Sequence, residues 1–182
     1  MAPTTTTPFV MRLIGAMALD PVTYEEVEAD HGATGQALLV VVLSSAGAGI
    51  GARGLGSGSL RSMVFISALS LLAWAAWALL TYQIGVKLMP ERQTQSDVGE
   101  LMRTIGFSAA PGMLRIFGIV PGAALAAFAI TAVWMLAAMV VAVRQALDYT
   151  STARAIAVCG LGWVLAVAIA VGLGVAFGPT VS

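Results

Sequence analysis

The charged residues of this chain are separated by long stretches that contain no Asp, Glu, Lys or Arg. These stretches lie at 31–52, 62–86, 104–114, 116–143 and 155–182. A helix that crosses the hydrocarbon core of a bilayer needs about 20 mostly apolar residues. Four of the five stretches reach that length, and the short one does so only if its helix extends past the flanking charges. The pattern predicts an all-α, polytopic membrane bundle with about five transmembrane helices.

The composition supports a membrane protein and argues against several kinds of site. Hydrophobic residues make up 59% of the chain and charged residues 10%, whereas soluble domains are about one quarter charged. The formal net charge is zero, so no overall field attracts nucleic acid. A single histidine, His31, and a single cysteine, Cys159, cannot supply the ligand cluster of a zinc site. We therefore expect no cofactor, no metal and no enzymatic activity.

Residues 1–31 form an N-terminal segment that precedes the transmembrane domain at 32–182. Apolar side chains recur in this segment at helical spacing: Phe9, Val10, Leu13, Ile14 and Met17. They predict an amphipathic helix that is too short to cross a bilayer. This helix either lies at the membrane surface or packs against the protein's own bundle, and the sequence favours neither position. Asp20 and Pro21 then predict the N-cap and first turn of a second helix.

Small residues repeat at intervals of four in the first and last predicted spans. In lipid, this spacing lets two helices approach closely, because little side chain separates their backbones. We expect the following residues to contact other helices, either within the chain or in a partner: Gly47, Gly51, Ala170, Gly174 and Gly178.

The third predicted span, about 101–118, contains Pro111 and Arg115 in an otherwise apolar run. An arginine at the centre of a bilayer costs about 2.5–3.5 kcal/mol on insertion scales. In the favoured interpretation, the helix ends near Gly118 and Arg115 extends to the exterior headgroups. In the other interpretation, Pro111 breaks the helix and Arg115 turns inward to bind an anion, a lipid headgroup or free carbonyls.

The distribution of Lys and Arg predicts the orientation of the chain. With five spans, one side carries Arg12, Lys87, Arg92, Arg103, Arg144 and Arg154, and the other side carries Arg53, Arg61 and Arg115. Basic residues accumulate on the cytoplasmic side, so we expect a cytoplasmic N-terminus and an exterior C-terminus in the cell (inner) membrane. A four-span alternative, with 104–118 at the membrane surface, divides the basic residues almost evenly. The clearer bias favours five spans.

Three segments of the chain resemble a known family. They are TYEEVEAD at 23–30, GELMRTIGFSAAPGMLRIFGIVPG at 99–122 and WMLAAMVVAVRQALDYTSTARA at 134–155. They resemble bacterial Yip-one (Ypt-interacting protein) domain proteins, and the similarity extends over about 9–178. Gly106, Phe107 and Pro111 look like the Gly-Tyr…Pro signature in the third span of that family, with Phe in place of Tyr. The resemblance implies a five-helix membrane fold with a cytoplasmic N-terminus.

The expected function is that of a non-enzymatic membrane organiser, an interaction protein or an accessory subunit of a larger membrane complex. The expected partners are the lipid bilayer and other membrane proteins or further copies of the chain. The alternative is a transporter or channel for small solutes or anions that uses the Pro-containing third helix. No acidic residue or histidine lies within a predicted span, so a proton or cation relay is not expected.

Overall fold

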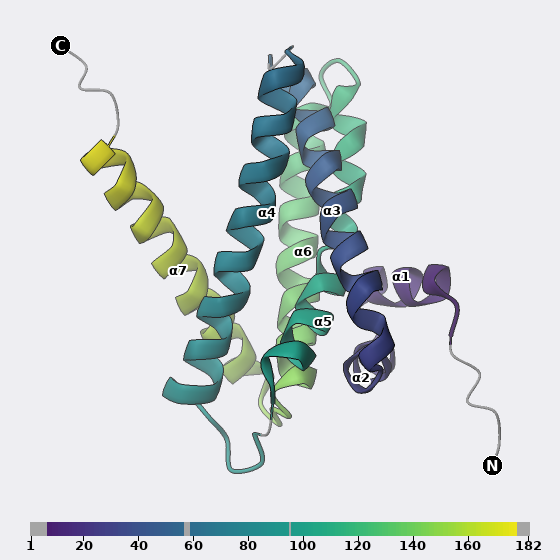
Figure 1. The fold of residues 1–182 in the computed structure, drawn as a ribbon, viewed down its shortest axis with the longest axis vertical. Helices are drawn as coiled ribbons and strands as arrows, with labels where there is room; N and C mark the ends of the chain where they lie inside the picture. The colour runs from purple at the N-terminus through teal and green to yellow at the C-terminus, as the bar shows by residue number, and fades with distance from the viewer. Residues whose placement is uncertain (1–6, 57–58, 95, 178–182) are drawn as a thin grey trace.

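The computed structural model describes residues 7–56, 59–94 and 96–177, and the protein is entirely helical within these ranges. The elements, in which η denotes a 3-10 or π segment, are α1 (Phe9–Met17), α2 (Pro21–Ala29), η1 (His31–Ala33), α3 (Thr34–Gly51), η2 (Ala52–Leu55), α4 (Leu60–Tyr82), η3 (Gln83–Leu88), α5 (Val98–Ser108), η4 (Ala110–Ile119), α6 (Ala124–Ala146) and α7 (Thr152–Phe177). Long helices form a bundle, and shorter ones flank it (Figure 1). The predicted all-α fold is confirmed.

Three described helical stretches are long and apolar enough to cross a membrane: His31–Leu55, Met63–Leu88 and Ala124–Ala146. They coincide with the first, second and fourth predicted spans. α7 is 26 residues long, and an apolar part of it covers Thr152–Leu165, which overlaps the fifth predicted span.

The third predicted span is divided into two elements and is not the single helix expected from the sequence. α5 ends at Ser108, and a 3-10 helix, η4, continues from Ala110 to Ile119. Pro111 has no N–H to donate, so it is tolerated in the first turn of a helix and not in its interior. A 3-10 helix rises about 2 Å per residue, against 1.5 Å in an α-helix. The ten residues of η4 therefore extend the segment by roughly 20 Å.

α5 and η4 run along α3 in the same direction. Near the start of this contact, Gly106 lies against Ala37. Near its end, Gly118 lies against Gly51. α4 and α6 run in the opposite direction, and α7 returns in the direction of α3 (Figure 1). The chain thus passes along the bundle five times, with α2 at one end (the α2 end) and η2 at the other (the η2 end).

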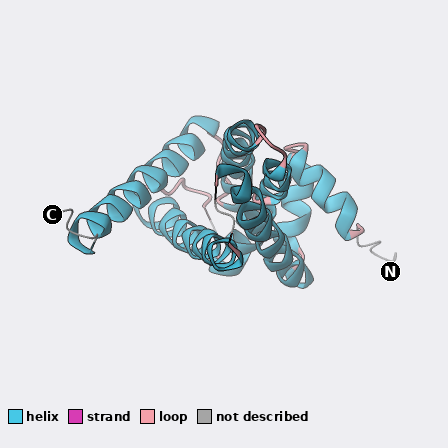
Figure 2. Ribbon diagram, turned by 90° about the horizontal axis from the view of Figure 1, so that it is seen from above, coloured by secondary structure: helices cyan, strands magenta, loops and turns pink. Residues whose placement is uncertain are grey.

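α1 lies across the direction of the long helices, on the opposite side of the bundle from α7 (Figures 1 and 2). Phe9, Leu13 and Met17 pack against the core formed by α2, α3, α5 and α6. Val10 and Ile14 are exposed. The structure therefore divides the predicted apolar stripe, since part of it packs on the bundle and part faces outward.

α7 is anchored to the bundle at its beginning. Ala155, Val158 and Cys159 are buried in a cluster with side chains of α4, α5 and α6. The hydroxyl of Tyr149, just before α7, donates to the carbonyl of Met89 at 2.8 Å. Beyond this cluster α7 diverges from α4 (Figure 1).

Candidate functional site

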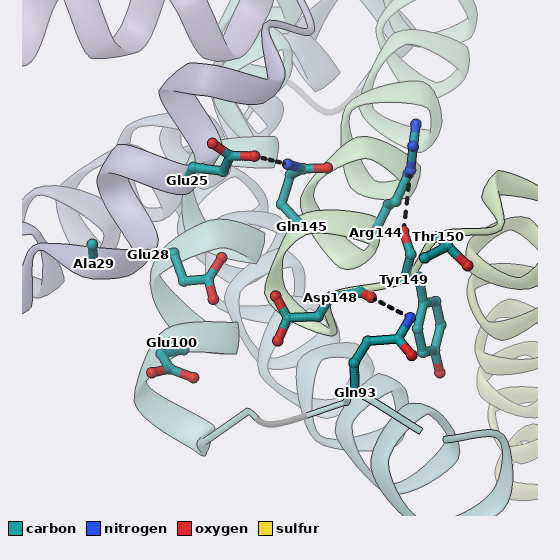
Figure 3. Close-up of a pocket in the computed structure, with 10 residues that line it drawn as sticks. All are labelled: Glu25, Glu28, Ala29, Gln93, Glu100, Arg144, Gln145, Asp148, Tyr149 and Thr150. Atoms are coloured by element: carbon teal, nitrogen blue, oxygen red, sulfur yellow. Dashed lines mark hydrogen bonds between the residues drawn. The ribbon is translucent and has the colours of Figure 1, made fainter. Parts of the chain in front are cut away.

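Four carboxylates from three parts of the chain surround a cavity of about 820 Å³ at the α2 end (Figure 3). We call this cavity the acidic basin; its carboxylates are Glu25 and Glu28 from α2, Glu100 from α5 and Asp148 from the α6–α7 connection. Gln145 donates to the Glu25 carboxylate at 2.6 Å. The approach of Glu25 and Glu28 to Glu100 and Asp148 depends on the fold, because these residues are distant in the sequence.

Glu28 is a partly buried carboxyl group of the acidic basin. Its pKa is raised to about 7, first because burial penalises the charged form and further because the charges of Asp148 and Glu100 repel it. Asp148 has a left-handed backbone (φ 51°) two residues after the end of α6, a conformation that Asp tolerates at a helix end. Within the described ranges, no group of three or more His, Cys, Asp or Glu side chains could hold a metal ion.

A buried arginine joins α1 to α2 and α3. The Arg12 side chain is 1% exposed, and its guanidinium donates to Glu26 at 2.9 Å, to Asp30 at 2.8 Å and to Gln36 at 3.1 Å. Two carboxylates and an amide therefore compensate the burial of one charge. In the sequence, Arg12 contributed only to the predicted orientation. A lone charge inside an apolar helix is nevertheless a signal that a partner lies elsewhere in the chain.

A second arginine fastens the same, C-terminal end of α2 to α5. Arg103 on α5 is 3% exposed and donates to the carbonyl oxygens of Val27 and Glu28, which lie in the last turn of α2. Carbonyls in a last helical turn have no partner within the helix, so a basic side chain stabilises them. Nothing in the local sequence indicated this contact, because its partners are about 75 residues apart.

The three residues of the signature pack within the bundle. A β-carbon on Gly106 would lie 2.8 Å from that of Ala37, so α3 and α5 could not approach as closely with a larger residue. Phe107 is fully buried, and its ring meets the edge of Phe9 with centroids 6.3 Å apart. Pro111 is also buried, at the start of η4. These residues hold α1, α3 and α5 together.

The side chain of Arg115 turns toward α6. Its Nε donates to the Thr131 hydroxyl at 3.2 Å, and its guanidinium lies over the Phe128 ring, 5.4 Å from the ring centroid. Thr131 is the eighth residue of α6, roughly 10 Å along the helix from its first residue. This differs from the favoured expectation of an arginine that reaches the exterior headgroups, because the α3–η4 contact directs the side chain into the bundle.

The predicted packing glycines of the first span lie against η4. A β-carbon on Gly47 would be 3.0 Å from the carbonyl oxygen of Met113, and one on Gly51 would collide with the carbonyl of Arg115. The side-chain surroundings of Ala170 and Gly174, and all of Gly178, lie outside the described residues, so their packing stays a prediction.

Five helical passes of mainly apolar composition define the class: a polytopic helical membrane protein. The family model that matches the chain is described as Yip1 domain and covers residues 14–173, so the chain belongs to the Yip1 domain family. Members of this family are trafficking-associated membrane proteins without enzymatic activity, which confirms the predictions of family and of a non-enzymatic protein. The comparisons with curated proteins and with solved structures found no match.

Proposed function

We propose that this protein organises the cytoplasmic membrane of a bacterium by embedding α1 in the cytoplasmic leaflet, beside its transmembrane bundle. In this proposal the segment 1–31 lies on the cytoplasmic side and the C-terminus lies outside the cell. The observation that carries the proposal is the division of α1 into an inner face that contains its one charged side chain, Arg12, and an outer face that is apolar.

The outward face of α1 is suited to lipid. Val10 is 60% exposed, Met11 56% and Ile14 55%, whereas the only charged side chain of the helix, Arg12, is buried. In water this arrangement is unfavourable, because each square ångström of exposed apolar surface costs about 25 cal/mol relative to burial. In the acyl region of a leaflet the same arrangement is favourable.

The position of α1 along the bundle supports the same environment. The indole N–H of Trp134 donates to the carbonyl of Met17, the last residue of α1, at 2.8 Å. Trp134 is the eleventh of the 23 residues of α6. α1 therefore lies beside the spanning part of α6 and not beyond its end. A helix there takes up area in one leaflet only, which favours curvature and local changes in lipid packing.

α1 is also held firmly by the rest of the chain. The Tyr24 hydroxyl donates to the carbonyl of Ala16 at 3.1 Å, and Tyr24 is itself fully buried. Arg12 adds its three partners from α2 and α3. Because these contacts fix α1 to the bundle, the lipids of the leaflet must pack around a helix in a set position. A helix on a flexible hinge would instead move to fit the lipids.

The location of α1 is tested by fluorescence quenching in liposomes. A Cys159→Ala background receives a cysteine in place of Ile14, which is labelled with bimane. We expect strong quenching by lipids that carry a spin label in the acyl chain, and little quenching by aqueous iodide. Glu25→Cys, in the acidic basin, is the matched control and should show the reverse. Iodide quenching of the Ile14 label as strong as that of the control would overturn the proposal.

The organising activity is tested by the size of reconstituted vesicles. We expect the wild-type protein to reduce the mean vesicle diameter at a high protein-to-lipid ratio, and Ile14→Glu to reduce it less. Ile14→Ala, which keeps the outer face apolar, is the control.

Transport is the competing hypothesis, and solute or anion flux in the same vesicles would favour it. Affinity purification in mild detergent would identify membrane-protein partners, which we expect to include other membrane proteins or further copies of the chain.

A further inference from the structure

A crevice between α4, α6 and α7 contains the Arg115 guanidinium and is separate from both α1 and the acidic basin. We propose that Arg115 binds a phosphate group in this crevice, and that the group belongs to a lipid that enters from the bilayer. Free inorganic phosphate has the same chemistry and is distinguished from lipid in the experiment below.

The Arg115 guanidinium is oriented by contacts that leave its outer nitrogens free. Its Nε is bound to Thr131, and the Thr131 hydroxyl in turn donates to the carbonyl of Ala127 at 2.7 Å. The Phe128 ring covers one face. Among the described residues, none accepts a hydrogen bond from the two terminal nitrogens. Such a fork matches two oxygens of a phosphate, with a geometry that lysine cannot reproduce.

In the part of the chain that the structure describes, no carboxylate lies near Arg115 to neutralise it. All nine Asp and Glu side chains belong to 20–30, to 91–100 or to Asp148, and these segments lie at the α2 end. The η2 end carries Arg53, Arg61 and Arg115 instead. A charge within a membrane bundle is costly unless it is paired. No Asp or Glu side chain is placed to neutralise Arg115, which lets the guanidinium bind an anion from outside the chain.

The space in front of Arg115 can receive such a group. Arg115 and Trp77 together line two neighbouring cavities, of about 320 Å³ and about 210 Å³. Each is several times the roughly 30 Å³ that one water molecule occupies in the liquid. The indole N–H of Trp77 is buried and has no acceptor among the described residues. The Trp77 side chain forms part of the wall of both cavities, and its N–H lies toward Gly162 on α7.

The crevice opens sideways and not toward either end of the bundle. Its rim includes Val133 and Trp163, which are 71% and 56% exposed and lie on the outer surface of spanning helices. In a membrane this surface is in contact with acyl chains. A lipid can therefore bring its phosphate to Arg115 while its chains stay in the bilayer, whereas a soluble anion must first cross an apolar layer.

The proposal is tested on the full chain in mild detergent, by native mass spectrometry and by the shift in melting temperature when ligand is added. The probes are phosphatidylglycerol, diacylglycerol with the same acyl chains, and sodium phosphate. We expect phosphatidylglycerol to bind and stabilise the protein, and diacylglycerol to do neither. Stabilisation by sodium phosphate alone to the same extent would assign the site to free phosphate and overturn the lipid entry.

Variants separate Arg115 from general attraction at the membrane surface. Arg115→Lys should weaken phosphatidylglycerol binding by about tenfold or more, the effect of losing one charge-assisted hydrogen bond. Arg53→Lys, an exposed arginine at the same end, is the matched control and should bind as the wild type does. Ala132→Phe leaves Arg115 in place and fills the crevice from α6, and it should also weaken binding. Unchanged binding in both Arg115→Lys and Ala132→Phe would overturn the proposal.

Discussion

The carbonyl oxygen of Arg115 occupies the space that a β-carbon on Gly51 would require. About one turn earlier, Gly47 lies in the same way against the carbonyl of Met113. η4 therefore contacts α3 through its backbone, and this contact sets the rotation of η4 about its own axis. Because that rotation is set, the Arg115 side chain points to Thr131 on α6 and not toward the end of the bundle.

Gly51→Ala should destabilise the protein. The added methyl group would force α3 and η4 apart, and overpacking of this kind costs about 1–3 kcal/mol. Denaturation in mixed micelles, followed by tryptophan fluorescence, would measure the loss. Gly35→Ala in the same helix is the matched control, because no atom lies within 4 Å of the added carbon. Its effect should stay below about 0.5 kcal/mol. Equal stability of the two variants would contradict the close contact.

Arg12→Ala should destabilise the protein, because it leaves the carboxylates that bind Arg12 without a partner. Removing one member of a buried ion pair costs about 3–5 kcal/mol. Glu26 and Asp30 keep 35% and 29% of their side chains exposed, so water compensates part of the loss, and we expect about 2–3 kcal/mol. The same denaturation assay applies. Arg53→Ala, at an exposed arginine, should change little, and an equally small effect of Arg12→Ala would show that α1 is not fastened by this side chain.

The stability of the protein should fall as the pH rises from 4.5 to about 7. The folded state raises the pKa of Glu28 from 4.5 to about 7, so in this range it binds more protons than the unfolded state. Stability then decreases with pH and this contribution is lost above the folded pKa. Charged Glu28 repels Asp148 and Glu100 across the acidic basin.

Glu28→Gln isolates this effect. The variant should lose most of the decrease in unfolding midpoint between pH 5 and pH 8 that the wild type shows. Glu25→Gln, at the exposed rim of the same basin, should keep most of it. A wild-type midpoint that rises over this range, or a decrease of the same size in Glu28→Gln, would show that Glu28 is not the group responsible.

The proposed orientation predicts opposite labelling of two positions. In a Cys159→Ala background, Leu55→Cys at the η2 end should react with a membrane-impermeant maleimide in intact cells. Arg92→Cys at the α2 end should react only after the membrane is permeabilised. Both positions are exposed in the structure, so a failure to react reflects the membrane and not burial. Labelling of both from outside would exclude the five-pass orientation.

Much of the fold was predictable, because the membrane imposes a simple rule on the sequence. Apolar runs of sufficient length predicted four of the five passes, and charges marked the connections between them. The third pass was predicted as one helix, and the structure instead has a break after Ser108. Pro111 indicated a disturbance there, but the extent of the 3-10 segment depends on its contact with α3, which no local pattern contains.

The candidate sites were far less predictable. Gly47 and Gly51 stood out by their spacing, and Arg115 by its cost in an apolar run. The contacts of Arg12 and the raised pKa of Glu28 did not stand out, since their partners come from other elements. A charged residue shows in the sequence only that it needs a partner, and the fold decides which one.

The sequence by itself therefore determined that the chain is a helical membrane protein with five apolar segments, because the hydrocarbon core accepts little else. Only the tertiary structure decided which way each polar side chain points. Burial of Arg12 leaves α1 with an apolar outer face, and the close approach of Gly51 to η4 turns Arg115 into the bundle. Both outcomes follow from backbone and side-chain contacts between segments distant in the sequence. The free energy of these contacts depends on packing geometry and not on hydrophobicity.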